Sequence, residues 1–295
     1  MRKRVAELFK YKKNIYSQNG EDGIIKEIFK RLEKKLNKTC VEFGAWDGIH
    51  WSNTYNLIKN HSFKAILIEG DKKRFKELNN NIPKCTIKIN RFVEFSGKNK
   101  LDNILKKHNF PKNFDFLSID IDGNDYHIFQ GLKIYRPKLI CIEFNPTISN
   151  EVNFIQEKNI KINQGCSALA LIELAKKKKY SPIVATNWNI FFIENSLKKY
   201  VIQKKNYKID DLIDNKNKNF IFTGYDGSII TSKKIVLPWH GITIDKINYL
   251  PKFLEQYPGN YNIFKRKMLS FFCFYRSPFK YFKYKYFKYF LNLRT

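Results

Sequence analysis

Apolar residues along the first two thirds of the chain alternate between short continuous runs and helical spacings. The continuous runs have the length of buried strands and lie at residues 39–43, 65–68, 86–90, 114–121 and 139–144. The segments with helical spacing lie at residues 24–36, 51–59, 75–80, 101–108 and 166–179. Such an alternation is typical of parallel strands that are joined by crossover helices.

Two further apolar runs, residues 183–186 and 190–193, flank Asn187-Trp188-Asn189 and predict a hairpin. The pattern therefore predicts an α/β fold, a doubly wound sheet that ends in an antiparallel hairpin at its edge. The expected divisions are a leading segment with a helix at residues 1–37, the α/β domain at 38–198, an appendage without an assigned fold at 199–264, and a basic tail at 265–295. Within the appendage, short strands are expected at residues 220–237 and a helix at 247–255.

Composition indicates that the chain can bury a core, because 43% of its 295 residues are hydrophobic and 16% are aromatic. The net charge is +28, from 55 Lys and Arg against 27 Asp and Glu. Basic residues are spread over most of the chain, which is typical of a biased overall composition rather than of a nucleic-acid surface. No apolar run approaches the roughly 20 residues of a membrane span and no leader peptide is recognisable, so a cytoplasmic protein is expected.

A glycine-containing loop follows the first predicted strand, in the sequence Val41-Glu42-Phe43-Gly44-Ala45-Trp46-Asp47-Gly48. Glycine here lets a ligand approach the backbone, and ligands of open α/β sheets bind beyond the carboxyl ends of the strands. Glu69 ends the next strand, where a carboxylate can accept both hydroxyl protons of a ribose. The phosphate-binding pattern Gly-x-Gly-x-x-Gly is absent, and the acids Glu42 and Asp47 would repel a pyrophosphate. A cationic nucleoside, S-adenosylmethionine, fits these acids better.

With these residues, the chain resembles a class I S-adenosylmethionine-dependent methyltransferase of the FkbM-like family over about residues 16–195. The segments that carry the resemblance are residues 16–23 (Tyr-Ser-Gln-Asn-Gly-Glu-Asp-Gly), 41–48, Glu69, 116–122 and 187–193. The resemblance implies a Rossmann-like sheet of about seven strands with the last strand antiparallel, S-adenosylmethionine as the cofactor, and methylation of hydroxyls on sugars or natural products. It also implies the cofactor-binding residues Ser17, Gln18, Glu42, Gly44, Ala45, Asp47, Gly48 and Glu69.

Two aspartates, Asp120 and Asp122, end the fourth predicted strand. At alternate positions of a strand their side chains point the same way. A carboxylate beside another has a raised pKa, which improves it as the general base for a hydroxyl proton. Asp120 is therefore the first choice for a catalytic base and Asp122 the second, although the pair can instead hold a metal ion, contact the cofactor or cap the next helix. Glu143, at the end of the fifth strand, is expected to border the pocket.

The interpretation that follows is an S-adenosylmethionine-dependent O-methyltransferase for a sugar or glycan precursor, with no metal site assigned. A metal-dependent glycosyltransferase that uses Asp120 and Asp122 is the rival enzyme, and a non-catalytic, membrane-associated adaptor on the same fold is a further alternative. Nucleic acid is disfavoured as a substrate. Residues 143–146 are similar to the Asn-Pro-Pro-aromatic motif of nucleic-acid amino methyltransferases, but they lack its second proline and its aromatic residue.

The tail, residues 265–295, contains nine basic residues and no acidic one. At 100° per residue, one helical face would hold Phe279, Phe282, Tyr286, Tyr289, Phe290 and Leu293. A basic amphipathic helix of this kind can lie on an anionic membrane, so peripheral binding at the inner membrane face is expected. Packing of the tail on the body of the protein and stacking with single-stranded nucleic acid are the alternatives.

Overall fold

The computed structural model describes residues 6–204, 206–214, 218–223, 229–237, 242–244, 262–279 and 282. The chain divides into two compact units, residues 1–216 and 217–295. All of the residues predicted to bind the cofactor or to act as the base belong to the first unit.

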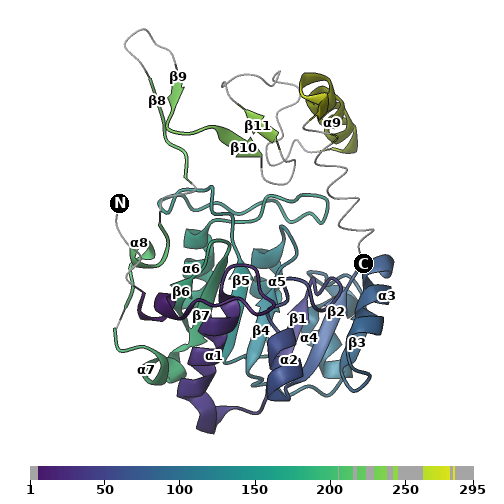
Figure 1. Cartoon of the computed structure of the whole chain (residues 1–295), viewed down its shortest axis with the longest axis vertical. Helices are drawn as coiled ribbons and strands as arrows, with labels where there is room; N and C mark the ends of the chain where they lie inside the picture. The colour runs from purple at the N-terminus through teal and green to yellow at the C-terminus, as the bar shows by residue number, and fades with distance from the viewer. Residues whose placement is uncertain are drawn as a thin grey trace. The chain divides into compact units, whose positions relative to one another are not determined.

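The first unit is built on a seven-stranded sheet in the order β3-β2-β1-β4-β5-β7-β6 (Figure 1). Its strands are β1 (Thr39–Phe43), β2 (Lys64–Glu69), β3 (Ile87–Asn90), β4 (Phe116–Ile119), β5 (Leu139–Glu143), β6 (Tyr180–Ala185) and β7 (Asn189–Glu194). Strands β1 to β5 are parallel, whereas β7 is antiparallel to both of its neighbours, β5 and β6. The predicted α/β fold is confirmed, including the terminal hairpin and the antiparallel last strand.

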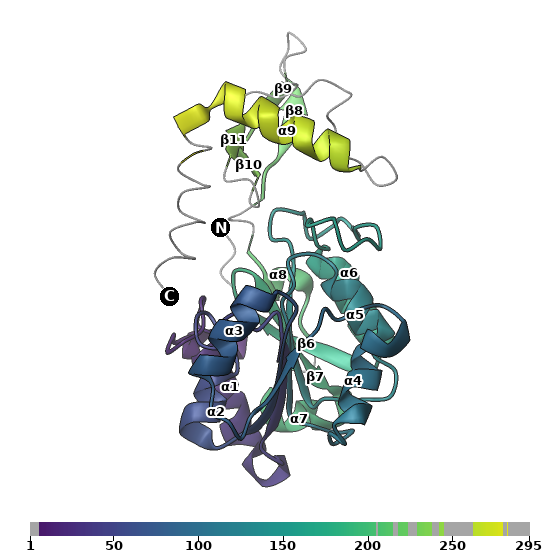
Figure 2. The same cartoon turned by 90° about the vertical axis from the view of Figure 1, so that its right-hand side faces the viewer.

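Helices cover both faces of this sheet: Figure 2 shows α1, α2 and α3 on one face and α4, α5 and α6 on the other. The α-helices of this unit are α1 (Glu21–Leu32), α2 (Tyr55–His61), α3 (Lys72–Asn81), α4 (Leu101–Lys107), α5 (Asp125–Gly131), α6 (Ala168–Lys177), α7 (Lys198–Val201) and α8 (Ile209–Leu212). The short 3-10 helices are η1 (Glu7–Tyr11), η2 (Glu33–Lys35), η3 (Gly97–Asn99) and η4 (Asn195–Leu197). In α1, Ile24, Ile28 and Leu32 are buried at helical spacing while the lysines between them are exposed, which orients the helix against the sheet.

Several helices differ from the sequence prediction, among them α3, which begins at Lys72 rather than at residue 75 because the side chain of Asp71 caps it. Helix α1 begins at Glu21 rather than at residue 24. Helix α2 begins at Tyr55 rather than at residue 51, because residues 52–54 form hydrogen bonds with Glu42 instead of continuing the helix. Helix α5 was not among the predicted helices; it has seven residues and starts at Asp125, whose carboxylate binds the backbone of the preceding loop.

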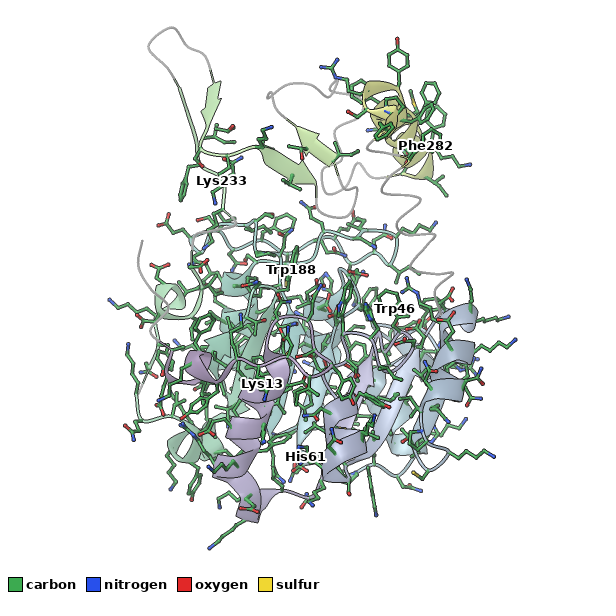
Figure 3. The ribbon with its side chains drawn as sticks, in the orientation of Figure 1. Lys13, Trp46, His61, Trp188, Lys233 and Phe282 are labelled. Carbon is green, nitrogen blue, oxygen red and sulfur yellow. The ribbon has the colours of Figure 1, made fainter. Side chains whose placement is uncertain are left out.

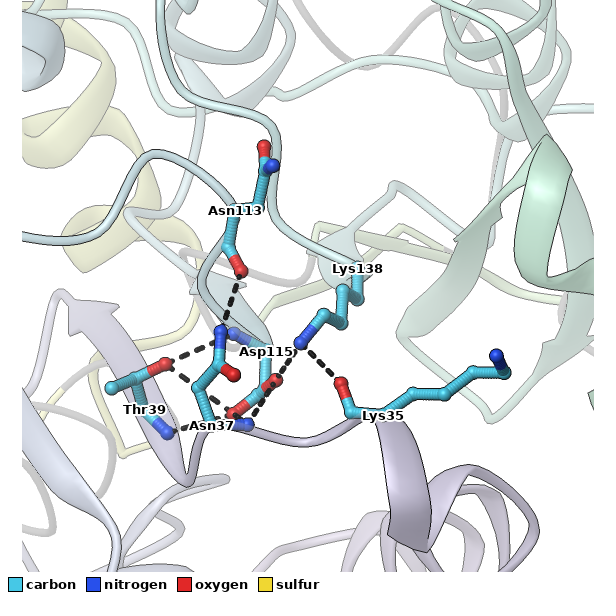
Figure 4. Close-up of polar contacts among 6 residues, drawn as sticks. All are labelled: Lys35, Asn37, Thr39, Asn113, Asp115 and Lys138. Carbon is cyan, nitrogen blue, oxygen red and sulfur yellow. Dashed lines mark hydrogen bonds and ion pairs between the residues drawn. The ribbon is translucent and has the colours of Figure 1, made fainter.

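A buried ion pair joins the amino ends of β1, β4 and β5 (Figure 4). Asp115, directly before β4, accepts hydrogen bonds from the backbone N–H groups of Asn37 (2.9 Å) and Thr39 (2.8 Å). Lys138, directly before β5, places its Nζ 2.6 Å from the same carboxylate. Because the carboxylate before β4 binds partners at the starts of β1 and β5, the starts of these three strands are aligned and their carboxyl ends reach the same edge of the sheet.

The described part of the second unit contains two short antiparallel strand pairs and the helix α9 (Ile263–Arg276). The strands are β8 (Ile221–Thr223) with β9 (Ile229–Thr231) and β10 (Ile235–Leu237) with β11 (Ile242–Ile244). The short strands expected within residues 220–237 are present, whereas the helix expected at 247–255 lies outside the described residues. Of the apolar face predicted for the tail, Tyr286, Tyr289, Phe290 and Leu293 also lie outside them. None of the helices in the described parts of the chain has the length and apolarity that crossing a bilayer requires.

Candidate active site

The carboxyl ends of β1, β2, β4 and β5 meet at one edge of the sheet, and the predicted acids lie there. The acids that these strands bring together are Glu42 in β1, Glu69 at the end of β2, Asp120 and Asp122 after β4, and Glu143 at the end of β5. In Figure 3, Trp46 and Trp188 mark this edge, whereas His61, at the end of α2, lies at the opposite edge. Parallel strand order thus collects chemistry-bearing residues from distant parts of the sequence.

Gly44 allows the loop after β1 to lie directly against the end of β4. Its φ is 73°, in the left-handed region, and a Cβ at this position would lie 1.7 Å from the carbonyl oxygen of Asp120. Glycine alone has both the backbone freedom and the missing side chain that this contact requires. The next residue, Ala45, donates its N–H to Ile68 of β2 at 3.2 Å, and Gly48, with a φ of 81°, leaves room for Ile82. The loop is therefore tied to both neighbouring strands.

Glu42 is buried, and both of its carboxylate oxygens accept hydrogen bonds. Oε2 accepts from the hydroxyls of Ser52 and Thr54, both at 2.6 Å, and Oε1 accepts from the N–H of Asn53 at 2.9 Å. Burial raises the pKa of Glu42, although these hydrogen bonds act in the opposite direction. Glu42 thus holds the segment between β1 and α2, and its contact with the cofactor stays a prediction.

Glu69 holds the glycine-containing loop to the end of β2. Its carboxylate accepts hydrogen bonds from the N–H groups of Trp46 (2.9 Å) and Asp71 (2.8 Å). Burial raises the pKa of Glu69, while these bonds and the charge of Arg74 oppose the shift. Within the loop, Asp47 accepts from the two backbone N–H groups that follow Gly48, at 2.9 and 2.7 Å. Because each oxygen of Glu69 accepts one hydrogen bond and can accept a second, the residue retains the capacity to bind two ribose hydroxyls.

Asp120, Asp122 and Glu143 form a carboxylate cluster whose ligand oxygens lie within 4.8 Å of one another. Burial and the neighbouring acids raise the pKa of Asp120 and of Glu143 well above their usual values. Asp125, at the start of α5, accepts from two backbone N–H groups of the preceding loop at 3.0 Å, and burial raises its pKa to about 6. Oxygens at this spacing can hold a metal ion, whereas a base for a hydroxyl proton requires only one of them.

The segment ahead of the sheet reaches the same region through Ser17, which forms a parallel bridge with Trp51. Ser17 is buried, whereas Gln18 is exposed and its Oε1 accepts a hydrogen bond from the side chain of Asn19 at 3.1 Å. Both residues were predicted to bind the cofactor. The structure places Ser17 inside, beside the segment that follows the glycine-containing loop, and turns Gln18 toward a neighbour at the surface.

Sequence reasoning assigned no role to Glu21 and Asp22, the two buried acids that begin α1. Glu21 accepts hydrogen bonds from Thr186 Oγ1 (2.6 Å) and Asn189 Nδ2 (3.2 Å) on the β6–β7 hairpin. Asp22 accepts from three backbone N–H groups of residues 15–17, each at 2.8 Å, through one oxygen. Both acids lie within residues 16–23, one of the segments that carry the resemblance to the FkbM-like family. Acids are also common in the first turn of any helix, so the sequence alone gave no reason to assign them a role in the site.

The doubly wound, seven-stranded sheet with an antiparallel last strand is a Rossmann-like methyltransferase fold. The family model of the methyltransferase FkbM domain matches residues 97–177, a range that contains Asp120, Asp122 and Glu143 and begins after the glycine-containing loop. The predicted resemblance to FkbM-like methyltransferases is confirmed by this match, which supports S-adenosylmethionine as the cofactor. It favours a methyltransferase over the rival glycosyltransferase.

Several solved structures are similar to this chain at low sequence identity. The O-methyltransferase from Bacillus cereus in complex with SAH is 16% identical, with 61% of this chain and 84% of that chain covered and a TM-score of 0.36. A SAM-dependent methyltransferase from Aquifex aeolicus is 12% identical, with 57% and 88% covered and a TM-score of 0.36. A pericyclic reaction enzyme is 12% identical, with 57% of this chain covered and a TM-score of 0.35, and the chain spans 46% of its length. No curated relative matches the sequence significantly.

Gly44→Ala is expected to destabilise the protein more than Gly97→Ala. Both glycines have a φ of 73°, but a Cβ at Gly97 meets nothing within 4 Å, whereas a Cβ at Gly44 meets the Asp120 carbonyl. The left-handed strain that both variants share costs about 1–2 kcal/mol. Gly44→Ala must in addition displace the loop from β4. Urea unfolding of the two variants measures the difference, and equal losses of stability would contradict the close contact.

Asp120→Asn is expected to stabilise the folded protein at neutral pH. Because the pKa of Asp120 is raised above its usual value of 3.8, the folded state binds the proton more tightly than the unfolded state. The wild type therefore loses stability as the pH rises through the folded-state pKa, and the neutral amide does not. Below the usual pKa, both side chains are neutral and the difference vanishes. Thermal unfolding between about pH 4 and about pH 8 tests this, and a variant less stable than the wild type at the upper pH would contradict it.

Proposed function

We propose that this protein transfers the methyl group of S-adenosylmethionine to a hydroxyl oxygen of a sugar or glycan precursor. The observation that carries the proposal is the carboxylate of Asp120. It follows β4, its backbone contacts Gly44 of the cofactor loop, and its pKa is raised. No described cationic side chain pairs with it, so it is suited to take a proton.

Each part of the site has a role in this proposal. The backbone from Gly44 to Gly48 lies against the cofactor, and Glu69 accepts hydrogen bonds from its ribose hydroxyls. Asp120 removes the proton of the acceptor hydroxyl, with Asp122 as the second choice for that base. When bound, S-adenosylmethionine supplies an electrophilic methyl group on a sulfonium. Holding the hydroxyl in line with that group supplies most of the rate, so one carboxylate suffices as the base.

The charge of the site supports a small neutral acceptor over a polyanion. Asp120, Asp122 and Glu143 concentrate carboxyl groups at one place, and in their ionised form these groups repel a phosphate. Nucleic acid therefore fits poorly despite the net charge of +28. Sugar hydroxyls, by contrast, donate hydrogen bonds to carboxylates. A divalent cation held by the same three acids would neutralise them and remove the repulsion of a phosphate. Methyl transfer is therefore measured with and without a chelator.

Asp120→Asn is expected to retain binding of S-adenosylhomocysteine and to lose methyl transfer about 100-fold or more, because a positioned general base contributes a factor of that size. The amide keeps the shape of the side chain but cannot accept the hydroxyl proton. Calorimetric titration measures the binding. Transfer of a labelled methyl group to neutral saccharides, with and without a chelator, measures turnover.

Glu69→Ala is the complementary variant, since it removes the acceptor of the ribose hydroxyls and should weaken binding of S-adenosylhomocysteine about tenfold or more. Glu151→Ala, at an exposed glutamate after β5, is the control and should bind like the wild type. Wild-type turnover by Asp120→Asn would remove Asp120 from the mechanism. If the protein binds a sugar nucleotide with manganese but does not bind S-adenosylhomocysteine, the glycosyltransferase interpretation replaces the proposed function.

We also propose that α9 attaches the protein peripherally to an anionic membrane. Phe264, Phe271 and Tyr275 are 67%, 70% and 80% exposed, and their spacing puts them on one face of the helix. Residues 262–279 contain basic residues and no acidic one. Exposed aromatic rings flanked by positive charge fit the interface of an anionic bilayer.

Replacing Phe271 and Tyr275 together by serine in the full chain is expected to reduce binding to phosphatidylglycerol vesicles several-fold or more, because both rings leave water on binding. High salt should weaken binding of the wild type as well. Ile160→Ser is the control, since Ile160 is 68% exposed in the first unit and outside the helix. Vesicle sedimentation measures the bound fraction, and equal sedimentation of all three proteins would exclude the membrane role of α9.

A further inference from the structure

One buried carboxylate oxygen beside the site has no hydrogen-bond donor among the described residues: Oδ1 of Asp22. Asp22 is the second residue of α1 and is 2% exposed. Its other oxygen, Oδ2, accepts from the backbone N–H groups of residues 15–17, each at 2.8 Å. The N–H of Asp22 donates to Ser17 Oγ at 3.0 Å. The side chain is therefore held in one orientation, with one charged oxygen left over.

An unpaired buried carboxylate oxygen costs free energy, so native structures seldom contain one without a reason. The neighbouring acids do not share this feature. Glu21 accepts hydrogen bonds on both oxygens, from Asn19 and from the β6–β7 hairpin. Glu42 also accepts on both oxygens, from residues 52–54. Among these three buried acids, only Asp22 has an oxygen without a described donor, while Asn189, whose Nδ2 donates to Glu21, also has a buried Oδ1 without a described hydrogen bond.

The contacts of Asp22 connect it to the segment that follows the glycine-containing loop. Ser17, which exchanges two hydrogen bonds with Asp22, forms a parallel bridge with Trp51. Trp51 directly precedes the three residues that bind the carboxylate of Glu42 in β1. The charge of Asp22 also contributes to the raised pKa of Glu42. Asp22 therefore lies between the leading segment and the loop that follows β1.

The missing partner of Oδ1 is best matched by a cationic N–H donor. Glu21, Asp22 and Glu42 bring three buried carboxylates to this corner, and no described cationic side chain pairs with them. A cation offsets that charge, whereas a neutral hydroxyl does not. S-adenosylmethionine carries two positive groups. Its sulfonium has no N–H, so only its α-ammonium can donate a hydrogen bond to the free oxygen.

We propose that Asp22 Oδ1 binds the α-ammonium group of the cofactor, and that the N–H groups of residues 15–17 hold the carboxylate in position for it. The inference rests on the proposed function, because it requires S-adenosylmethionine as the cofactor. It adds a binding residue from α1, outside the sheet and outside the glycine-containing loop.

Asp22→Asn tests the proposal with little disturbance of the loop. The amide oxygen can replace Oδ2 as the acceptor of three N–H groups, which puts an NH2 donor where the free oxygen lies. We expect the dissociation constant of S-adenosylhomocysteine to rise about tenfold or more in calorimetric titration. That of the des-amino analogue, which lacks the ammonium, should not change. Asp102→Asn is the control, because Asp102 is 1% exposed and also accepts from three backbone N–H groups, although unlike Asp22 it pairs with a lysine, Lys100, at 3.1 Å.

The possible outcomes separate this inference from the proposed function. Unchanged affinity of Asp22→Asn for S-adenosylhomocysteine, or an equal loss for both compounds, overturns the role of Asp22 alone. Failure of the wild type to bind S-adenosylhomocysteine overturns the proposed function as well. One measurement needs no variant: the wild type should bind S-adenosylhomocysteine about tenfold more tightly than the des-amino analogue. Equal affinities overturn the inference.

Discussion

A group of acids without described cationic partners, at the carboxyl edge of the sheet, is the constraint around which the site is built. The acids that gather there without a described cationic partner are Glu21, Asp22, Glu42, Asp120, Asp125 and Glu143. Desolvation and mutual repulsion oppose this arrangement, and they raise the pKa of Asp120, Asp125 and Glu143. Backbone N–H groups and hydroxyls replace water around several of these acids. At the opposite edge, Asp115 is instead paired with Lys138. The amino ends of the strands therefore hold a paired, structural carboxylate, and the carboxyl ends hold the unpaired acids of the candidate site.

The sheet was predictable from the sequence because its buried strands consist of continuous runs of apolar residues. Residues 39–43 coincide with β1, the run 183–186 overlaps β6, and the run 190–193 lies within β7. Strands that are covered on both faces need apolar residues at every position, and such runs are easily recognised. Gly44 was predictable for an equally local reason, since a sharp turn at a strand end requires it. Helix α5 was not predicted, because it is short and its start is determined by the hydrogen bonds of Asp125.

The site was less predictable, because the hydrogen bonds that define it join distant segments. Glu21 binds Thr186 and Asn189, which follow it by 165 and 168 residues, and no local pattern records that contact. The sequence identified Glu42 as an acid next to the glycine-containing loop. It does not reveal that residues 52–54 donate hydrogen bonds to both oxygens of this carboxylate. The strand pattern therefore identifies which acids reach the edge of the sheet. Which of their oxygens are free depends on tertiary packing.

The positive charge of the chain and the acidity of its site act over different distances. The net charge of +28 comes from lysines and arginines that are spread along the sequence. At physiological ionic strength, exposed charges are largely screened beyond about 8 Å, whereas buried charges are screened much less. A ligand inside the pocket therefore experiences mainly the nearby carboxylates. A cationic cofactor is compatible with a basic protein for this reason, and the same exposed basic residues can attract an anionic surface without weakening the pocket.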